Sequence, residues 1–444
     1  MRSKTFGRGG VHPQENKFSS SAAIIKLNIP EIVSIPVTQH LGAPAEPLVK
    51  RGDKVKVGQL IAQSTGFISA NIHSSVSGTV EKIDNIIDSS GYRKPAVIIK
   101  TDGDEWEEHI DRSDELKKNI NLTTEEIIQK IKDSGIVGLG GATFPTSVKL
   151  SVPAGKKATH LLINGVECEP YLTSDHRLML EKTEELLVGV TILMQALSVE
   201  QAYIGIEKNK PDAIEKLQQY AKNYTGIQVV PLKVMYPQGG EKQLIKAILN
   251  REVPSGKLPV DVGAVVFNVG TTFAVYEAVQ KNKPLFERVV TITGKSIKQP
   301  SNFLVRIGTP ISKLIEAAGG LPEDTGKIIS GGPMMGKALN AIDVPVVKGT
   351  SGVVVIKKTE ARRMHEVACV RCGKCISVCP MGLEPYLLAL YAKNELYEKA
   401  EKERSMDCIE CGCCQYTCPS GKPLLDRIRL NKNRIIHIKK TKAV

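Results

Sequence analysis

The chain has 444 residues, of which 41% are hydrophobic, and it carries a formal net charge of +13. This length fits two to four domains, and the apolar content excludes an intrinsically disordered protein. No stretch approaches the 18 or more apolar residues of a membrane span, and the start of the chain lacks the apolar region of a signal peptide. The lysines are scattered instead of clustered with aromatic residues, which argues against nucleic-acid binding. We therefore expect a multidomain protein that is kept in the cytoplasm and has no nucleic-acid partner.

Residues 1–40 are predicted to form an N-terminal arm, and residues 41–100 contain short strands separated by glycines. The expected strands lie at 48–51, 55–57, 60–62 and 77–80. This stretch resembles the biotinyl-lipoyl or barrel-sandwich fold, a family that carries its cofactor on a hairpin lysine. The corresponding residues 68–73 contain no lysine. We therefore predict a barrel-sandwich domain that is not a swinging-arm carrier, in which His73 is a turn or packing residue.

An acid-rich stretch, residues 101–120, is predicted to be a linker, and an α/β domain is expected over residues 121–286. Thr123 and Glu126 have the spacing of a capping box, which predicts a helix that ends before Gly135. Apolar runs at 161–163, 202–206, 229–232 and 262–269 then alternate with helical segments. Such alternation is typical of a largely parallel sheet covered by helices. Short strands around one helix at 310–318 predict a small β-grasp domain over residues 287–358.

Two polar segments of the α/β domain are candidates for a binding site. The glycines at 138, 140 and 141 would let backbone N–H groups approach a phosphate, although a tight turn explains a glycine cluster equally well. A second string, residues 164–170, follows the expected strand 161–163 and contains one amide and two carboxylates. Open α/β sheets bind their ligands at this end of the strands, so these polar side chains are functional candidates.

Eight of the ten cysteines form two copies of the pattern C-x2-C-x2-C-x3-C-P within residues 359–430, which are predicted to be a helical ferredoxin domain. Three thiolates from one such loop bind one 4Fe-4S cluster, and in two-cluster ferredoxins the fourth cysteine reaches across to the other cluster. The alternatives are zinc sites, which prefer ligand sets of longer reach, and disulfides, which need an oxidising compartment. We predict two 4Fe-4S clusters, one held by Cys369, Cys372, Cys375 and Cys418, and the other by Cys408, Cys411, Cys414 and Cys379.

Two cysteines and the end of the chain fall outside this pattern. Cys168 and Cys413 lie off the ligand spacing and are expected to bind no iron. Residues 431–444 form a basic tail, which is either a solvated terminus or a segment that lies beside a membrane or a partner protein.

The glycine loop, with Phe144 and Lys149 after it, and the string from Asn164 to Pro170 resemble the flavoprotein subunit of respiratory complex I. That flavoprotein binds FMN and NADH, so the resemblance implies both cofactors. It also implies that Glu167 and Glu169 lie at the flavin and the nicotinamide dinucleotide and that Phe144 stacks on a ring. The implied FMN contacts are Gly138, Gly140, Gly141, Lys149, Asn164, Glu241 and Asn268. Val166, Lys242 and Phe267 depart from the complex I pattern, and no flavin contact is carried over to them.

Nearly the whole chain resembles the RnfC family, the cytoplasmic subunits of the Rnf membrane complex (ferredoxin:NAD oxidoreductase). The marks are residues 5–6, 9–13, 236–242 and 331–336, together with the doubled cysteine pattern. The resemblance implies an NAD(H)-dependent oxidoreductase subunit on the cytoplasmic side of the membrane, bound peripherally, with ion translocation left to its partners. FMN is needed because hydride carries two electrons whereas a 4Fe-4S cluster accepts one.

The resemblance also implies partner proteins, and two alternative functions stay open. The implied partners are the other Rnf subunits and a ferredoxin-type carrier that docks directly or through another subunit. A related cobalamin-reductase flavoprotein, which pairs a similar flavin domain with two clusters, and a flavin-free iron–sulfur conduit are the alternatives.

Overall fold

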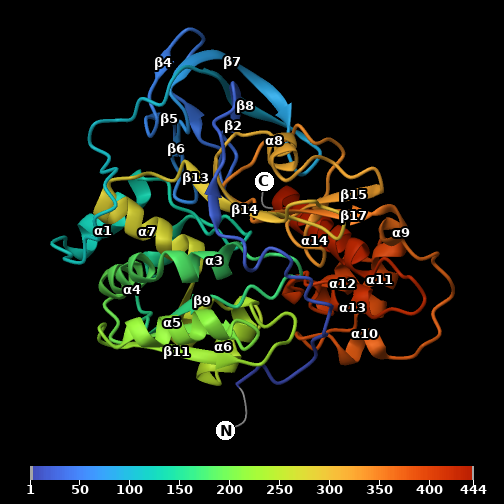
Figure 1. Cartoon of the computed structure of the whole chain (residues 1–444). Helices are drawn as coiled ribbons and strands as arrows, with labels where there is room; N and C mark the ends of the chain where they lie inside the picture. Colours follow the sequence, from blue (N-terminus) through green and yellow to red (C-terminus); the bar gives the residue numbers. More distant parts are fainter. Residues whose placement is uncertain (1–3, 443–444) are drawn as a thin grey trace.

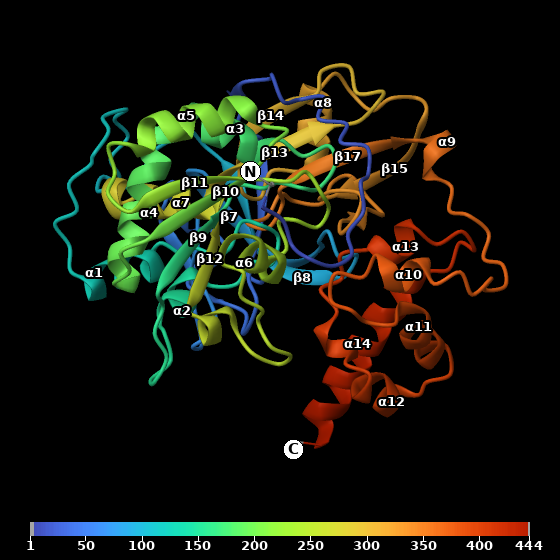
Figure 2. The same ribbon diagram turned by 90° about the horizontal axis from the view of Figure 1, so that it is seen from below.

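The computed structural model describes residues 4–442 as four units that follow one another along the chain. Residues 1–3 of the predicted arm and 443–444 of the predicted tail lie outside the described residues. A barrel of short strands lies at the top of Figure 1, with α/β layers below it and a mixed sheet beside both. The C-terminal helices form a fourth unit, which Figure 2 shows set off to one side. This is the predicted multidomain α/β architecture.

The barrel unit consists of two small antiparallel sheets. Its strands are β2 (Ile32–Pro36), β3 (Glu46–Pro47), β4 (Lys54–Val55), β5 (Leu60–Gln63), β6 (Ile72–His73), β7 (Gly78–Ile87) and β8 (Arg93–Thr101). They pair in the orders β2-β8-β7-β4 and β3-β5-β6. His73 is buried, and burial lowers its pKa to about 3. It is therefore a neutral packing residue, as predicted.

Two segments of the barrel differ from the prediction. Residues 48–51 form no strand, because the chain turns there, and the backbone N–H of Lys50 donates to the carboxylate of Asp53 at 2.9 Å. Strand β2 lies inside the predicted arm 1–40, yet it pairs with β8 through Ile35 and Val97. The N-terminal segment is therefore partly built into the barrel.

The α/β unit contains a parallel four-stranded sheet, as predicted. Its elements are α1 (Thr124–Asp133), α2 (Thr146–Leu150), β9 (His160–Asn164), α3 (Ser174–Glu181), α4 (Thr183–Leu197), β10 (Ala202–Glu207), α5 (Pro211–Ala221), β11 (Ile227–Leu232), α6 (Glu241–Leu249), the 3-10 helix η1 (Pro259–Val262), β12 (Ala264–Asn268) and α7 (Val269–Lys281). The strand order is β11-β10-β9-β12. Leu161 and Ile163 of β9 belong to the core shared with α4 and α7, whereas Leu162 packs with α6. Successive side chains of a strand point to opposite faces, so helices cover both sides.

Helix α1 begins at the predicted capping box. The Thr123 hydroxyl accepts from the Glu126 backbone N–H at 3.3 Å, and the Glu126 carboxylate accepts from the Thr123 N–H at 2.7 Å. The linker before it, residues 102–120, forms no helix, but its Trp106 packs edge-on against Phe286 with ring centroids 5.2 Å apart.

The mixed sheet contains one strand from the other end of the chain. Its elements are β1 (Ile24–Lys26), β13 (Glu287–Thr293), β14 (Ser301–Arg306), α8 (Ile311–Ala317), β15 (Thr325–Ser330), β16 (Lys337–Ala338) and β17 (Gly352–Lys357). They pair in the order β1-β14-β13-β17-β15-β16. Helix α8 matches the prediction, whereas β1 falls in the predicted arm and lies parallel to β14 at the edge of the sheet.

The C-terminal unit is helical, as predicted. Its elements are α9 (Lys358–Ala361), α10 (Lys374–Ser377), α11 (Pro385–Lys393), α12 (Tyr397–Lys402), the 3-10 helix η2 (Ser405–Asp407), α13 (Cys413–Tyr416) and α14 (Leu424–Lys442). Helix α14 continues into the predicted basic tail. There the Lys432 ammonium donates to the Cys408 carbonyl at 2.7 Å and to the Glu410 carboxylate at 2.6 Å. The described part of the tail is thus a helix that packs on the cysteine loops near Lys432, while most of residues 433–441 are exposed.

Candidate functional site

The carboxyl ends of β9 and β12 meet where the strand order of the parallel sheet reverses. The chain proceeds from β9 outward through β10 and β11, and then returns to place β12 on the other side of β9. Asn164 ends β9 and is paired in register with Asn268, which ends β12. Such a reversal point is where open α/β sheets bind ligands, and two of the predicted residues lie side by side there.

The glycine loop, residues 138–144, closes on itself beside these strand ends. The Gly138 N–H donates to the Phe144 carbonyl at 2.9 Å, and the Thr143 N–H donates to the Gly138 carbonyl at 3.1 Å. A Cβ atom added at Gly140 would lie 3.4 Å from the Asn268 Cβ, so loop and strand end are in contact. Gly141 has φ +106°, which glycine adopts without strain.

The glycine loop is also held by hydrogen bonds to two side chains outside it. The Leu139 N–H donates to the Thr271 hydroxyl at 2.8 Å, and the buried Arg288 donates to the Leu139 carbonyl at 3.3 Å. Within residues 4–442, the N–H groups of residues 140–142 donate to no protein acceptor. Backbone amides without a protein acceptor on an anchored loop can bind a phosphate group, so this loop fits the phosphate of FMN.

Lys149 and Glu241 bring a second pair of predicted residues to the same place. The Lys149 ammonium, on α2, lies 2.6 Å from the Glu241 carboxylate at the start of α6 and 2.7 Å from the Val266 carbonyl of β12. The Asn164 amide donates to the Gly239 carbonyl at 2.8 Å, just before α6. The strand-edge site, as we call it, thus comprises the glycine loop, Lys149, Asn164, Glu241 and Asn268.

The Asn268 side chain has three hydrogen-bond partners within the protein. Its oxygen accepts from the N–H groups of Gly270 and Thr271 at 2.8 and 3.3 Å and so caps α7, while its amide donates to Asp175 at 2.6 Å. Burial and the neighbouring Glu167 raise the pKa of Asp175 to about 7. Asp175 could not be singled out from the sequence, because an acid in the first turn of a helix is common and carries no specific signal.

Glu167, predicted at the flavin, caps α3 in the structure. Its carboxylate accepts from the N–H groups of Asp175 and His176 at 2.8 and 3.1 Å and from the Ser174 hydroxyl at 3.3 Å. A carboxylate at a helix N-terminus is stabilised by the unpaired amides and by the helix dipole. The side chain therefore has a structural function whether or not a nucleotide is bound.

Glu169 contacts the loop between β15 and β16, and the Met334 carbonyl of this loop lies beside Gly412 of the second cysteine run. Its carboxylate accepts from the N–H groups of Met334 and Met335 at 3.1 and 2.8 Å, in the loop between β15 and β16. Desolvation raises the pKa of Glu169 to about 7, against the lowering by these two amides. The structure thus connects Glu169 to the mixed sheet, and its implied place at the nicotinamide dinucleotide stays a prediction.

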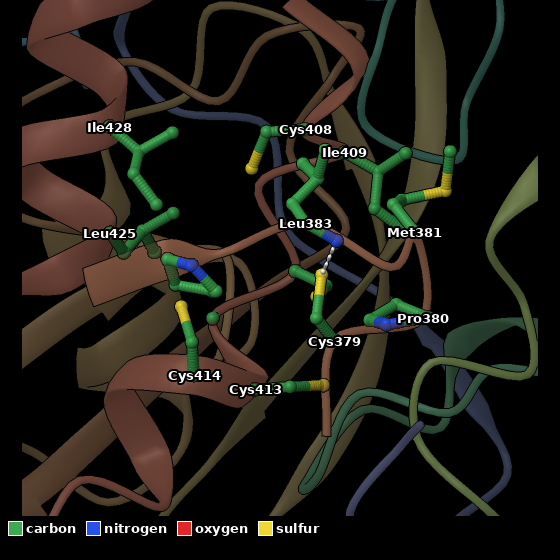
Figure 3. A pocket seen from close by; sticks show the side chains of 13 residues that line it. Cys379, Pro380, Met381, Leu383, Cys408, Ile409, Cys413, Cys414, Leu425 and Ile428 are labelled. Carbon is green, nitrogen blue, oxygen red and sulfur yellow. Dashed lines mark hydrogen bonds between the residues drawn. The ribbon is translucent and has the colours of Figure 1, made fainter. Parts of the chain in front are cut away.

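The cysteine pocket is lined by sulfur atoms from both cysteine runs. Apolar residues such as Leu425 and Ile428 close its sides. Figure 3 shows the sulfurs of Cys408 and Cys414 pointing toward the space beside Cys379. The cysteines that line the pocket and have the ligand spacing are Cys379, Cys408, Cys411 and Cys414. This is the crossed set predicted for the second cluster.

Backbone donors surround the sulfurs, as a cluster site requires. The Leu383 N–H lies 3.4 Å from the Cys379 sulfur, and the Glu410 N–H lies 3.4 Å from the Cys408 sulfur. Hydrogen bonds to the ligand sulfurs are one of the levers that set the potential of a 4Fe-4S cluster. The donor set, the apolar walls and the amides fit such a cluster.

The other crossed set lies nearer the surface. Cys375 and Cys418 pack on the same apolar cluster as Cys379 and Cys414, whereas Cys369 and Cys372 are exposed. The two cysteine loops have the same backbone conformation even so. Positive φ angles recur at matching positions of the two runs: Arg371 (54°) and Glu410 (57°), Gly373 (71°) and Gly412 (79°), Gly382 (64°) and Gly421 (59°).

Of the two remaining cysteines, Cys413 lines the pocket beside Cys411, and Cys168 lies outside it. The Cys413 sulfur faces the Tyr236 carbonyl at 3.9 Å, and in Figure 3 it points away from the sulfurs of Cys408 and Cys414. The Cys168 sulfur accepts from the Gly239 N–H at 3.4 Å, and burial raises the pKa of this thiol to about 12. A protonated thiol is a poor nucleophile and a poor ligand.

Proteins of similar sequence match this chain over most of its length. The chain is 48% identical over 401 residues to the C subunit of the proton-translocating ferredoxin:NAD(+) oxidoreductase complex of Clostridium ljungdahlii, covering 90% of this chain and 87% of that protein. It is 44% identical to the Na(+)-translocating counterpart of Acetobacterium woodii, covering 97% of both. The chain belongs to the RnfC family. A third member, from the ion-translocating oxidoreductase complex of Rhodobacter capsulatus, is 44% identical over 86% of this chain and 74% of its own length.

Family models assign domains within this RnfC chain. Residues 5–104 match the RnfC barrel sandwich hybrid domain, and 131–277 match the Nuo51 FMN-binding domain. Residues 289–338 match the SLBB domain, and 362–419 match a 4Fe-4S dicluster domain. The predicted family, fold class and cofactors, FMN and two 4Fe-4S clusters, are thereby confirmed.

Proposed function

We propose that this RnfC chain moves electrons between two 4Fe-4S clusters and NAD(H) through FMN, as one subunit of a membrane-bound ferredoxin:NAD+ oxidoreductase complex. The names of its relatives and its FMN-binding and dicluster domains support this function. Its partners are the other subunits of the complex, and a ferredoxin-type carrier is the electron donor, directly or through another subunit. Ion translocation is then the task of those partner subunits.

One observation carries the proposal: a single short segment touches both the strand-edge site and the cysteine pocket. The Tyr236 hydroxyl donates to the Cys411 carbonyl at 2.7 Å. Three residues later the Gly239 carbonyl accepts from Asn164, and Glu241 follows at the Lys149 ion pair. The two sites are therefore joined by the six residues 236–241, as a relay between a flavin and a cluster requires.

At the strand-edge site this chain's own residues would bind and orient the flavin. FMN, when bound, exchanges two electrons with NAD(H) and single electrons with the clusters. The amides of the glycine loop would bind its phosphate, and the Lys149 ammonium, whose partner Glu241 is half-exposed, would offset the negative charge. The proposed FMN contacts are Gly138, Gly140, Gly141, Lys149, Asn164, Glu241 and Asn268.

The three residues predicted to be catalytic take different parts in this proposal. Phe144 closes the glycine loop through its backbone, and its half-buried ring would stack on the nucleotide. Glu167 would act through α3, by holding Asp175 against Asn268. Glu169 would bind the loop that contains Met334 and would hold the mixed sheet against the cysteine pocket.

The two clusters would use crossed ligand sets, as the pattern predicts. One would be held by Cys379, Cys408, Cys411 and Cys414, which line the pocket next to Tyr236. The other would be held by Cys369, Cys372, Cys375 and Cys418, nearer the surface.

Attachment to the membrane would be peripheral and on the cytoplasmic side. None of the helices within residues 4–442 is long and apolar enough to cross a bilayer. We expect a chaotropic salt wash, without detergent, to release this chain from membranes that contain the complex. Retention until detergent is added would contradict peripheral attachment.

Anaerobic cofactor analysis tests the function. We expect about eight irons and about one FMN per chain, and bleaching of both chromophores on addition of NADH. Lys149→Gln should lower the FMN content several-fold and leave the iron unchanged. Lys157→Gln, at an exposed position nearby, is the matched control and should keep both.

The same experiment distinguishes the proposed function from that of a flavin-free iron–sulfur conduit. Iron absorbance without flavin, and no bleaching by NADH, would show an iron–sulfur conduit and would overturn the proposal. Equal FMN content in the Lys149 and Lys157 variants would remove Lys149 from the site but leave the function standing.

A further inference from the structure

The N-terminal segment, residues 4–11, runs along the seam between the α/β unit and the C-terminal helices. In Figure 1 it is the dark blue trace between the green helices and the red ones. Lys4 forms a parallel bridge with Leu232 at the end of β11, and the Lys233 N–H donates to the Lys4 carbonyl at 3.0 Å. The Thr5 hydroxyl then donates to the side-chain oxygen of Gln238 at 2.8 Å. One side of the segment is thus fastened to the α/β unit.

The other side of the segment contacts the first cysteine run. The Gly10 N–H donates to the Val378 carbonyl at 2.9 Å. A Cβ atom added at Gly9 would lie 2.6 Å from the backbone carbon of Cys379 and 2.6 Å from the Val378 oxygen. Gly9 also has φ +71°, a conformation that other residues adopt only with strain. The segment therefore approaches the backbone of a cluster cysteine more closely than any side chain would permit.

The next residue links the segment to the second cysteine run. Val11 and Tyr236 exchange two backbone hydrogen bonds of 2.8 and 2.9 Å. The Tyr236 hydroxyl in turn donates to the Cys411 carbonyl. Val11, Tyr236, Cys411 and Cys413 form one apolar cluster. Three consecutive residues, 9–11, thus reach ligands from both runs that line the same pocket.

We propose that residues 4–11 are a strap that positions Cys379 against the α/β unit, and that Gly9 is its positioning residue. The strap would fix the cysteine pocket at a set distance from the strand-edge site. The inference rests on the proposed function in one respect, namely that the pocket holds a cluster that exchanges electrons with the flavin. The contact itself involves only protein backbone.

A glycine in the same strap supplies the control. Gly7 has open space around it, with no atom within 4 Å of an added Cβ, and its φ is not in the left-handed region. Gly9→Ala and Gly7→Ala therefore add the same methyl group two residues apart. Only the first must push the Cys379 backbone out of place.

The experiment compares the two variants in the anaerobically purified full chain. In Gly9→Ala we expect the spectrum of one of the two reduced clusters to change or disappear by electron paramagnetic resonance, with a loss of up to about half of the iron. NADH-dependent reduction of ferricyanide, which can take electrons from the flavin directly, should stay within about twofold. Gly7→Ala should match the parent in all three measurements.

A milder variant tests the strap if the Gly9→Ala protein cannot be purified. Thr5→Val removes the hydrogen bond to Gln238 without a clash. We expect hydrogen–deuterium exchange in residues 376–382 to become several-fold faster in this variant, while exchange in β9 stays unchanged. Unchanged exchange in residues 376–382 would overturn the strap.

The outcomes also separate the strap from the proposed function. If Gly9→Ala matches Gly7→Ala in both cluster spectra and iron content, the strap is wrong, whatever the flavin does. If the parent protein shows no reaction with NADH, the proposed function fails, but the cluster spectra and the exchange rates still decide on the strap.

Discussion

Cys413 and Cys414 are adjacent, so the ligand set of the second run depends on which of the two thiols binds iron. Cys413 is fully buried, yet its sulfur faces the Tyr236 carbonyl. Replacing it with serine should therefore leave about eight irons per chain, whereas Cys414→Ser should lose about half of them. Iron determination on the two purified variants checks this. Loss of half the iron from the Cys413 variant would show that the register of ligands is shifted by one residue.

Asp175 makes the stability of the α/β unit depend on pH. Burial and the charge of Glu167 raise its pKa from 3.8 to about 7, so the folded chain keeps a proton that the unfolded chain releases between pH 4 and 7. The free energy of unfolding should therefore fall as the pH rises through this window, by on the order of 4 kcal/mol in all. Asp175→Asn should remove this contribution.

Urea midpoints at pH 5 and pH 7 measure the effect. The exposed Asp133 offers a control, since Asp133→Asn should keep the pH dependence of the parent. A variant at position 175 that retains the full slope would assign the pH dependence to another group, such as Glu169.

Among the elements, α14 is joined to α11 by one buried amide. Asn431 is fully buried, and its side chain donates to the Leu388 carbonyl at 2.7 Å. Asn431→Ala should lower the free energy of unfolding of the C-terminal unit by about 1–3 kcal/mol, because the hydrogen bond is lost and a small cavity is left. Asn433→Ala, on the exposed side of the same helix, should change it by less than about 0.5 kcal/mol. Equal thermal unfolding of the two variants would mean that this bond contributes nothing.

Elements with local signals were the ones that the sequence could predict. The capping box at Thr123 and the apolar run at 161–163 depend on residues close together in the chain, and both are where they were expected. Strand β1 carries no such signal, because it exists only by pairing with Asn302 and its neighbours far along the chain. The acids of the linker did not reveal how Trp106 packs against Phe286.

The same distinction applies to the candidate site. The cysteine spacing fixes which thiols belong to one loop, so the crossed set that lines the pocket could be predicted. The direction of Glu169 could not, because it depends on a loop contributed by the mixed sheet. Asp175 was missed for a similar reason, since only the fold brings it to Asn268.

At the scale of the whole molecule, two loops of the same conformation have different surroundings. Cys411 and Cys414 are buried, whereas Cys369 and Cys372 are exposed. An iron chelator added anaerobically should therefore remove iron in two phases of about equal size, the first from the exposed set. Absorbance and electron paramagnetic resonance, recorded together, should show one cluster intact after the first phase. Loss of all the iron in a single phase would contradict a difference in solvent exposure between the two cluster sites.

The strap of residues 4–11 has a consequence for how the protein is made. The ribosome completes Gly9 first and Cys379 about 370 residues later (379 − 9), yet the two lie in contact. At about 5–20 residues per second, the strap must wait roughly 20–75 s for its partner. The α/β unit can fold during that time, whereas the seam closes only near the end of synthesis. A bulky tag fused before Lys4 would lie beside that seam, so the far end of α14 is the safer place for one.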